Sequence, residues 1–252
     1  MEIGFSTLSL FMKSFDEICE IATTNNFKMI ELLSEGPYNP ENLLENKYLL
    51  EPFYSYDLEL NIHGPNIDLN LASLNDGIRN ESIRQIKRTL DLASEINANF
   101  ITIHPGQVGR RETRIRDMAI YNSKNSIKEC VEYGENLSCE ISVENMPNNF
   151  KFLGTSVSEL SEIAKFAGCK VTIDSGHANT CENTGDFFNM ENISYFHLHD
   201  NNGDKDTHLP LGCGNLDLNL LKKVKKGSIE LDNFDNILKS RNIITEFLKN
   251  KY

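Results

Sequence analysis

The sequence lacks paired cysteine motifs and long apolar runs. Its six cysteines are scattered and form no CxxC pair, which fits reduced, mostly buried thiols rather than a disulfide framework. A chain of 252 residues can bury a core large enough to fold without disulfides. No run approaches the roughly 18 apolar residues of a membrane span, and residues 1–4 begin a strand rather than a signal peptide. We therefore expect a cytoplasmic protein with no membrane partner.

Positive charge is also scarce. The chain has 25 Lys and Arg against 37 Asp and Glu, a formal net charge of −12. Such a surface repels polyanions on average, which disfavours general nucleic-acid binding but allows a local basic patch. Four arginines fall within residues 110–116. We expect Arg110 and Arg111 to contact substrate by clamping a phosphate, although a solvated helix start explains such a charge run equally well.

Short apolar strands alternate with longer helical patterns, which is typical of βαβ units and a parallel sheet. The expected strands span residues 2–7, 28–33, 58–63, 100–104, 137–144, 169–174, 193–199 and 228–231. The expected helices span residues 14–25, 40–56, 80–96, 114–134, 156–167, 185–190, 216–225 and 234–249. Eight such units without a linker predict an α/β protein, a single (β/α)8 TIM barrel domain over residues 1–252. An open doubly wound sheet is the alternative, but it usually stops at five or six strands and no GxGxxG follows the first strand.

The expected strands end in side chains that can bind metal ions. These are His63, His104, Glu144, Asp174, His197 with His199, and Glu230. The carboxyl ends of barrel strands meet at one mouth, where active sites of this fold are built. A polar residue often ends a strand, so each position alone is weak, but six consecutive strands together favour a metal site. Imidazole and carboxylate groups suit zinc, manganese or iron. Glu31, which ends the second strand, is expected to face the mouth or to be an ordinary carboxylate at the rim.

Several motifs in order resemble the xylose isomerase-like TIM barrel superfamily, which joins sugar phosphate isomerases and epimerases to endonuclease IV (AP endonuclease family 2). The motifs are IHGP at 62–65, DLNLAS at 68–73, IHPG at 103–106, VENM at 143–146, IDSGHAN at 173–179, HLHDN at 197–201, DTHLPLG at 206–212 and IE at 229–230. The resemblance covers essentially the whole chain.

The resemblance implies two possible ligand sets. The endonuclease IV pattern, with its three-zinc cluster, implies nine metal ligands: His63, His104, Glu144, Asp174, His177, His197, Asp206, His208 and Glu230. The sugar epimerases imply one divalent ion on four of them: Glu144, Asp174, His197 and Glu230. In that branch the two glutamates also act as acid and base on opposite faces of the substrate. His199 replaces what is commonly a small polar residue in the endonuclease branch, and we expect His177 and His199 to contact substrate.

Three functions are compatible with these residues. The preferred one is an isomerase or epimerase that acts on a small sugar, polyol or sugar phosphate through an enediolate stabilised by Zn²⁺ or Mn²⁺, with one to three ions bound. The second is an abasic-site endonuclease, for which DNA is the partner, and the third is a metal-binding barrel without turnover. The acidic surface and the near absence of basic residues on the loops after strands one and two favour the first. We also expect that the protein can form a homodimer.

Overall fold

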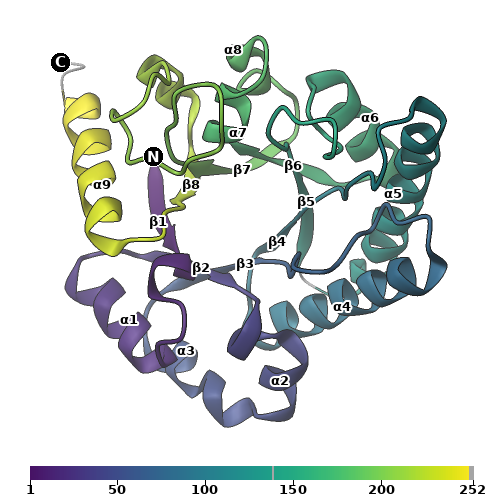
Figure 1. Cartoon of the computed structure of the whole chain (residues 1–252). Coiled ribbons are helices and arrows are strands. Elements are labelled where there is room, and N and C mark those ends of the chain that lie inside the picture. The colour runs from purple at the N-terminus through teal and green to yellow at the C-terminus, as the bar shows by residue number, and fades with distance from the viewer. Residues whose placement is uncertain (138, 250–252) are drawn as a thin grey trace.

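Eight parallel strands close into a barrel in which each strand pairs with its neighbours in chain order (Figure 1). The computed structural model describes residues 1–137 and 139–249. The strands are β1 (Glu2–Ser6), β2 (Met29–Leu33), β3 (Glu59–His63), β4 (Phe100–Ile103), β5 (Glu140–Glu144), β6 (Lys170–Asp174), β7 (Ile193–Leu198) and β8 (Lys226–Ile229). Pairing of β1 with β8, from Glu2 opposite Lys226 to Phe5 opposite Ile229, closes the ring. The predicted (β/α)8 barrel is confirmed.

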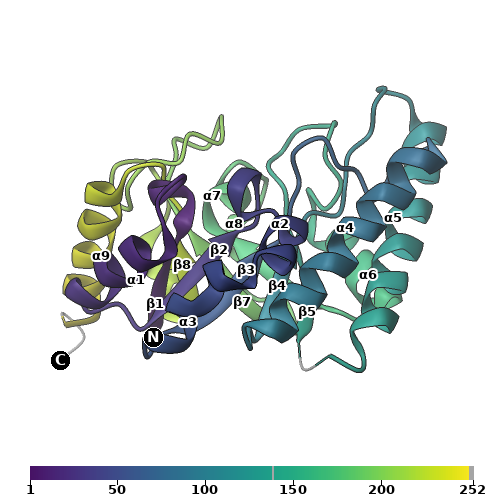
Figure 2. The same cartoon turned by 90° about the horizontal axis from the view of Figure 1, so that it is seen from below.

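Helices surround the barrel, and the longer loops rise from the face opposite the N-terminus (Figures 1 and 2). The α-helices are α1 (Phe15–Thr24), α2 (Pro40–Glu45), α3 (Glu51–Ser55), α4 (Asp76–Glu95), α5 (Thr113–Gly134), α6 (Val157–Ala167), α7 (Ser175–Asn179), α8 (Thr184–Phe187) and α9 (Phe234–Lys249). Short 3-10 helices cover Thr7–Leu10, Gly36–Tyr38, Lys47–Leu50 and Leu218–Lys223. None of the described helices has the length and apolar character needed to cross a bilayer.

Local interactions move several element boundaries away from the predicted ones. Helix α4 begins at Asp76 rather than at residue 80, because the Asn75 side chain accepts hydrogen bonds from the backbone N–H of Gly77 (2.9 Å) and Ile78 (3.3 Å). The helix expected over residues 40–56 is instead three short helices, with Pro52 in the first turn of the last one.

Other elements also differ from their predicted bounds. Residues 216–225 form only the 3-10 turn Leu218–Lys223, and β8 begins earlier, at Lys226. The helix expected over residues 185–190 is the single turn α8. Strand β5 begins at Glu140, and residue 138 of the expected strand lies outside the described residues.

The strands alternate between apolar side chains that pack against the helices and side chains, many of them polar, that fill the barrel. On β3 to β6 the outward positions include Ile62, Ile101, Val143 and Ile173, each of them fully buried. The inward positions form layers along the barrel. Met29, Phe100 and Tyr195 make a separate apolar cluster in which the Phe100 and Tyr195 ring centroids are 4.5 Å apart.

Hydroxyl groups form the next layer inside the barrel. Thr172 Oγ1 lies 3.0 Å from Thr102 Oγ1 and 2.7 Å from Ser142 Oγ, and Ser142 Oγ lies 2.9 Å from Ser194 Oγ. These contacts join β4, β5, β6 and β7 across the interior and satisfy the buried hydroxyls. Because side chains repeat every two residues along a strand, the next inward positions after Thr102, Ser142 and Thr172 are 104, 144 and 174. Glu144 and Asp174 are the last residues of β5 and β6, so strand geometry delivers them to the mouth. His104 and Glu230 were expected inside their strands, but β4 ends at Ile103 and β8 at Ile229, and both ligands are the first residue after the strand.

Candidate metal centre

The nine predicted ligands gather at the carboxyl-terminal mouth in three neighbouring groups, and within each group the ligand atoms lie within 4.8 Å of one another. The central group comprises Glu144, Asp174, His197 and Glu230. The β3–β4 group comprises His63, His104 and Glu144. The loop group comprises His177, His199, Asp206 and His208. The structure thus brings together the nine ligands that the family resemblance implies. His199, which the sequence placed beside His197 among the side chains that can bind metal ions, joins the loop group.

The central group is built around His197, which is fully buried. Its Nδ1 lies 2.7 Å from Glu144 Oε1 and 3.1 Å from Glu230 Oε2. Burial disfavours the charged imidazole, but Glu31, Glu144 and Glu230 outweigh it and raise the pKa of His197 well above its ordinary value. Burial likewise opposes ionisation of Glu144, yet the imidazoles, His197 foremost, hold the pKa of Glu144 well below the ordinary value. The central group therefore keeps its carboxylates ionised, and these carboxylates stabilise a positive charge placed among them.

Glu31 orients His197 from below. Its Oε1 lies 2.9 Å from His197 Nε2, and its other oxygen accepts a hydrogen bond from the Ser228 hydroxyl. Glu31 is buried and pairs with Asn61, two residues before the His63 that ends β3, so it lies one layer below the ligands of the mouth rather than at the rim, and it faces them through His197. A carboxylate that accepts the N–H of a histidine fixes the tautomer and directs the other ring nitrogen toward a metal. Here that nitrogen is Nδ1, which faces Glu144 and Glu230.

Glu144 connects the central group to the β3–β4 group. Its Oε2 lies 3.1 Å from His104 Nε2 and 3.6 Å from His63 Nε2. The Nδ1 of His63 faces the carbonyl oxygen of Gly64 at 2.9 Å, which again leaves Nε2 toward the carboxylate. Burial lowers the pKa of His104, whereas Glu144 and Glu230 overcome burial at His63 and raise its pKa to about 9.

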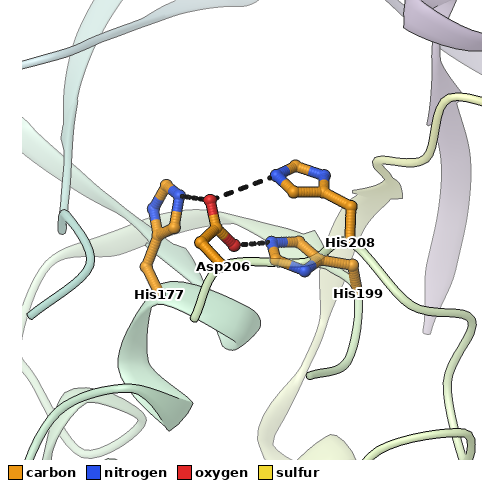
Figure 3. A group of neighbouring side chains, drawn as sticks. All are labelled: His177, His199, Asp206 and His208. Carbon is orange, nitrogen blue, oxygen red and sulfur yellow. Dashed lines mark hydrogen bonds and ion pairs between the residues drawn. The ribbon is translucent and has the colours of Figure 1, made fainter. Parts of the chain in front are cut away.

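The loop group lies beside helix α7, with the Asp206 carboxylate between three imidazoles (Figure 3). Asp206 Oδ2 lies 3.1 Å from His177 Nε2 and 3.3 Å from His208 Nε2, and Asp206 Oδ1 lies 3.6 Å from His199 Nε2. Helix α7 was not predicted from the sequence. It forms because the Asp174 side chain accepts a hydrogen bond of 2.6 Å from the backbone N–H of His177, which caps the helix. The same cap brings His177 beside the central group.

Asp200 holds the loop that carries Asp206 and His208. Its carboxylate accepts hydrogen bonds of 2.8 to 3.0 Å from four backbone N–H groups, at positions 201, 212, 214 and 216. Asp200 also pairs with Leu209 through backbone hydrogen bonds of 2.8 and 2.7 Å. Sequence reasoning missed this role, because the four N–H groups lie up to 16 residues away along the chain.

Several buried polar atoms of the site make no hydrogen bond within the described part of the chain: Glu144 Oε2, Asp174 Oδ2, His199 Nε2 and Asp206 Oδ1. A buried polar atom without a partner is unfavourable, and such atoms in native proteins call for an explanation such as a bound ion. All four atoms belong to the three groups above, and imidazole nitrogens with carboxylate oxygens are the donors that Zn²⁺ and Mn²⁺ accept. The residues therefore fit divalent metal ions.

A cavity of 660 Å³ opens above the metal groups. Seven of the predicted ligands line it: His63, His104, Glu144, His177, Asp206, His208 and Glu230. Apolar residues such as Leu8, Ile67 and Phe152 form part of the wall, and Lys151 contributes a cation. A volume of this size suits a small molecule with several polar groups. His199 is fully buried and is not part of the lining.

The arginine run lies beside this cavity rather than in it. Arg110 and Arg111 are exposed and line a neighbouring cavity of 710 Å³, which shares Asn70, Gln107 and Lys151 with the first. Arg111 lies over the ring of Phe150, with its guanidinium carbon 5.5 Å from the ring centroid. Neither arginine reaches the metal groups in this structure.

Comparison with known proteins identifies the family of the chain. A sequence profile described as "Xylose isomerase-like TIM barrel" matches residues 7–230. An uncharacterized protein of Methanocaldococcus jannaschii is 33% identical over 266 residues, covering 99% of this chain and 90% of its own. The crystal structure of a D-tagatose 3-epimerase-like protein is 32% identical, covers 99% of this chain and 97% of its own, and superposes with a TM-score of 0.86.

Endonuclease IV from Thermus thermophilus is 17% identical, covers 99% of this chain and 100% of its own, and superposes with a TM-score of 0.74. At this identity the likeness shows the fold alone. The profile, by contrast, covers most of the chain, from the end of β1 to Glu230 of the central group. The chain therefore belongs to the xylose isomerase-like TIM barrel family.

Proposed function

We propose that the protein is a divalent-metal-dependent isomerase or epimerase that acts on a small sugar, polyol or sugar phosphate. One observation carries the proposal: Glu144 at the end of β5 and Glu230 just after β8 both approach Nδ1 of His197, at 2.7 and 3.1 Å, at the floor of the cavity. Two carboxylates on one centre can act on two faces of a substrate carbon. The similarity to a D-tagatose 3-epimerase-like protein supports this choice.

Each residue of the central group, and Glu31 below it, has its own role in the proposed reaction. Glu144, Asp174, His197 and Glu230 would hold the ion, which supplies stabilisation of negative charge on substrate oxygens next to the reacting carbon. Glu144, as the carboxylate, removes a proton from the carbon beside the carbonyl. Glu230, which enters the step as the carboxylic acid, returns a proton from the other side, and proton exchange with solvent restores both groups. Glu31 keeps His197 in one orientation throughout, because it is fully buried and cannot move into solvent.

The experiment is a proton-exchange assay. Metal-loaded protein is incubated in D2O with a panel of ketoses, inosose-like polyols and their phosphates, and deuterium at the carbon beside the carbonyl is followed by NMR. Exchange is expected with at least one substrate, and Glu230→Gln should lower its rate by at least about 100-fold, the usual contribution of a positioned acid or base. Glu191→Gln, at an exposed position, serves as the control. Unchanged exchange in Glu230→Gln would remove Glu230 from the mechanism.

The complete set of nine ligands favours a second candidate, an endonuclease IV-like phosphodiesterase that cleaves DNA at abasic sites. The net charge of −12 and the position of Arg110 and Arg111 outside the metal cavity disfavour it. Nicking of an abasic-site duplex by the metal-loaded protein, lost both with chelator and in Glu230→Gln, would overturn the isomerase proposal. A metal-binding barrel without turnover is the third candidate, and it predicts no activity in either assay.

The metal is proposed to be Zn²⁺ or Mn²⁺, in one to three copies, on the basis of the donor atoms. The cytoplasmic location and the homodimer remain predictions from the sequence.

A further inference from the structure

We infer that His199 is a fourth protein ligand of the loop group, which turns this group into a closed zinc site that fastens the 200–209 loop to helix α7. The nine-residue pattern implied by the family does not include position 199. The inference requires only that the loop group binds zinc, and it holds whichever reaction the central group catalyses.

The first observation is an unpartnered buried nitrogen. His199 is 0% exposed, and within the described residues its Nε2 makes no hydrogen bond of acceptable geometry. This nitrogen lies 3.6 Å from Asp206 Oδ1, which is also buried and without a hydrogen-bond partner in the same part of the chain. Two such atoms that face each other, as Figure 3 shows, are explained by a cation that both of them bind.

The second observation is the common orientation of the three imidazoles around Asp206. In each ring Nδ1 faces a backbone carbonyl oxygen, at 2.8 Å for His177, 3.1 Å for His208 and 3.5 Å for His199. In each ring Nε2 faces the Asp206 carboxylate. Metal-binding histidines characteristically donate the N–H that does not face the metal to such an acceptor, which leaves the other nitrogen free to bind. His199 shares this arrangement with the two histidines already expected to be ligands.

The third observation is that the chain makes room for this ring. A Cβ at Gly176 would lie 1.9 Å from Cε1 and 2.3 Å from Nδ1 of His199, so any larger residue at 176 would displace the imidazole. On its other side the ring stacks on His208, with centroids 3.9 Å apart and planes at 7°. The Ser175 hydroxyl donates to the backbone carbonyl oxygen of His199 (2.7 Å) and accepts from the backbone N–H of His199 (3.0 Å). The position of the ring is therefore specified from three directions.

Four protein ligands complete the coordination that zinc prefers in structural sites, whereas catalytic sites keep one position open. His208 also has a backbone φ of 44°, in the left-handed region that a non-glycine residue adopts at some cost. A closed metal site accounts for this conformation, because the ion would hold the His208 ring beside Asp206 and stabilise the strained turn.

The competing explanation is that His199 only donates a hydrogen bond to Asp174, since its Nε2 lies 3.0 Å from Asp174 Oδ1. The two explanations predict different losses. A ligand at the loop group, when removed, weakens metal binding there. A hydrogen-bond donor to Asp174, when removed, weakens metal binding at the central group and leaves the loop group intact.

The test uses the full-length protein loaded with Zn²⁺ or Co²⁺, and the variant His199→Asn. The wild-type protein is expected to retain one slowly exchanging equivalent of zinc after dialysis against a chelator. The Co²⁺ that it retains after the same dialysis should show the intense visible absorption of a four-coordinate site. His199→Asn should lose that equivalent and that absorption. Glu230→Gln, which alters a possible ligand of the central group and none of the loop group, should keep both. A His199→Asn protein that keeps the retained zinc and the absorption overturns the inference.

A measurement on the unmodified chain covers the case in which His199→Asn does not fold. Wild-type protein with ¹⁵N-labelled histidine is loaded with ¹¹³Cd²⁺, and coupling between cadmium and ring nitrogens is recorded by NMR. The inference predicts coupling to Nε2 of His177, His199 and His208 from one cadmium resonance. Coupling of that resonance to His177 and His208 without His199 overturns it.

Discussion

Replacement of Glu31 provides a direct test of how the barrel interior supports the central group. Glu31→Gln keeps the volume of the side chain and its ability to accept the N–H of His197, but it removes the negative charge. Glu31→Ala removes the acceptor as well and leaves the buried Nε2 of His197 without a partner. Both changes lie one layer below the metal ligands, so neither removes a donor atom from the ion.

The expected magnitudes follow from the geometry. The contact between Glu31 and His197 is 2.9 Å long, and both residues are 0% exposed, so solvent does not screen it. Loss of such a supporting carboxylate typically lowers metal affinity by about 10- to 100-fold, or roughly 1.4 to 2.7 kcal/mol. A hydrogen bond to a charged acceptor is about twice as strong as a neutral one. We therefore expect Glu31→Gln to lower the metal affinity by about 10-fold and Glu31→Ala to lower it by about 100-fold.

The assay is a competition titration with a chromophoric chelator, which reports the affinity of the central group for Zn²⁺ or Mn²⁺. Glu140→Gln, at the exposed first residue of β5, is the matched control and should bind as the wild type does. If Glu31→Gln and Glu31→Ala both bind within about twofold of the wild type, the assignment of Glu31 as the residue that orients His197 is refuted.

Three further predictions concern pH, the loop and the substrate. The pKa values of His63 and His177 are raised to about 9 and about 10. These imidazoles therefore hold their protons more tightly in the folded protein than in the unfolded one. Chelator-treated protein should lose thermal stability as the pH rises from about 6.5 through 9. Zinc-loaded protein, whose imidazoles bind metal instead, should lack this loss; equal melting temperatures of the chelated protein at pH 6.5 and 9 would contradict the reasoning. Asp200→Asn should lower the free energy of unfolding by about 3 kcal/mol in urea denaturation, because four N–H groups lose a charged acceptor, whereas Asp232→Asn at an exposed position should have little effect. Lys151→Met should raise KM for phosphorylated substrates more than for neutral ones, since Lys151 lines both cavities; an equal effect on the two classes would exclude phosphate recognition by this residue.

The barrel and the ligands at its strand ends could be predicted because both follow from the alternation of side-chain direction along a strand, which repeats every two residues. Apolar outward positions mark each strand, and the inward position at its carboxyl end must lie at the mouth once the sheet closes. His63, Glu144 and Asp174 could therefore be placed at the mouth from the sequence, and the structure has them there. The family motifs added His177, Asp206 and His208, which lie on a short helix and a loop where periodicity gives no guide.

The supporting residues could not be predicted because their partners are distant in sequence. Glu31 meets His197 across 166 positions, and no local pattern marks that contact. Asp200 binds N–H groups of an irregular loop, whose path depends on Asp200 itself. The fit of His199 against Gly176 likewise depends on how two strand ends approach each other. Errors at helix boundaries, such as the start of α4, arose from single side-chain caps that compete with helix periodicity.

The two carboxylate oxygens of Glu144 face different groups, Oε1 toward His197 and Oε2 toward His63 and His104. The central and β3–β4 groups are therefore thermodynamically linked, and an ion at one must change the affinity at the other by the same factor in both directions. Two cations on a shared carboxylate repel each other, so the linkage should be negative and the second ion should bind more weakly than the first. The supply of free metal in the cell, rather than the protein alone, would then set how many ions the mouth of the barrel carries.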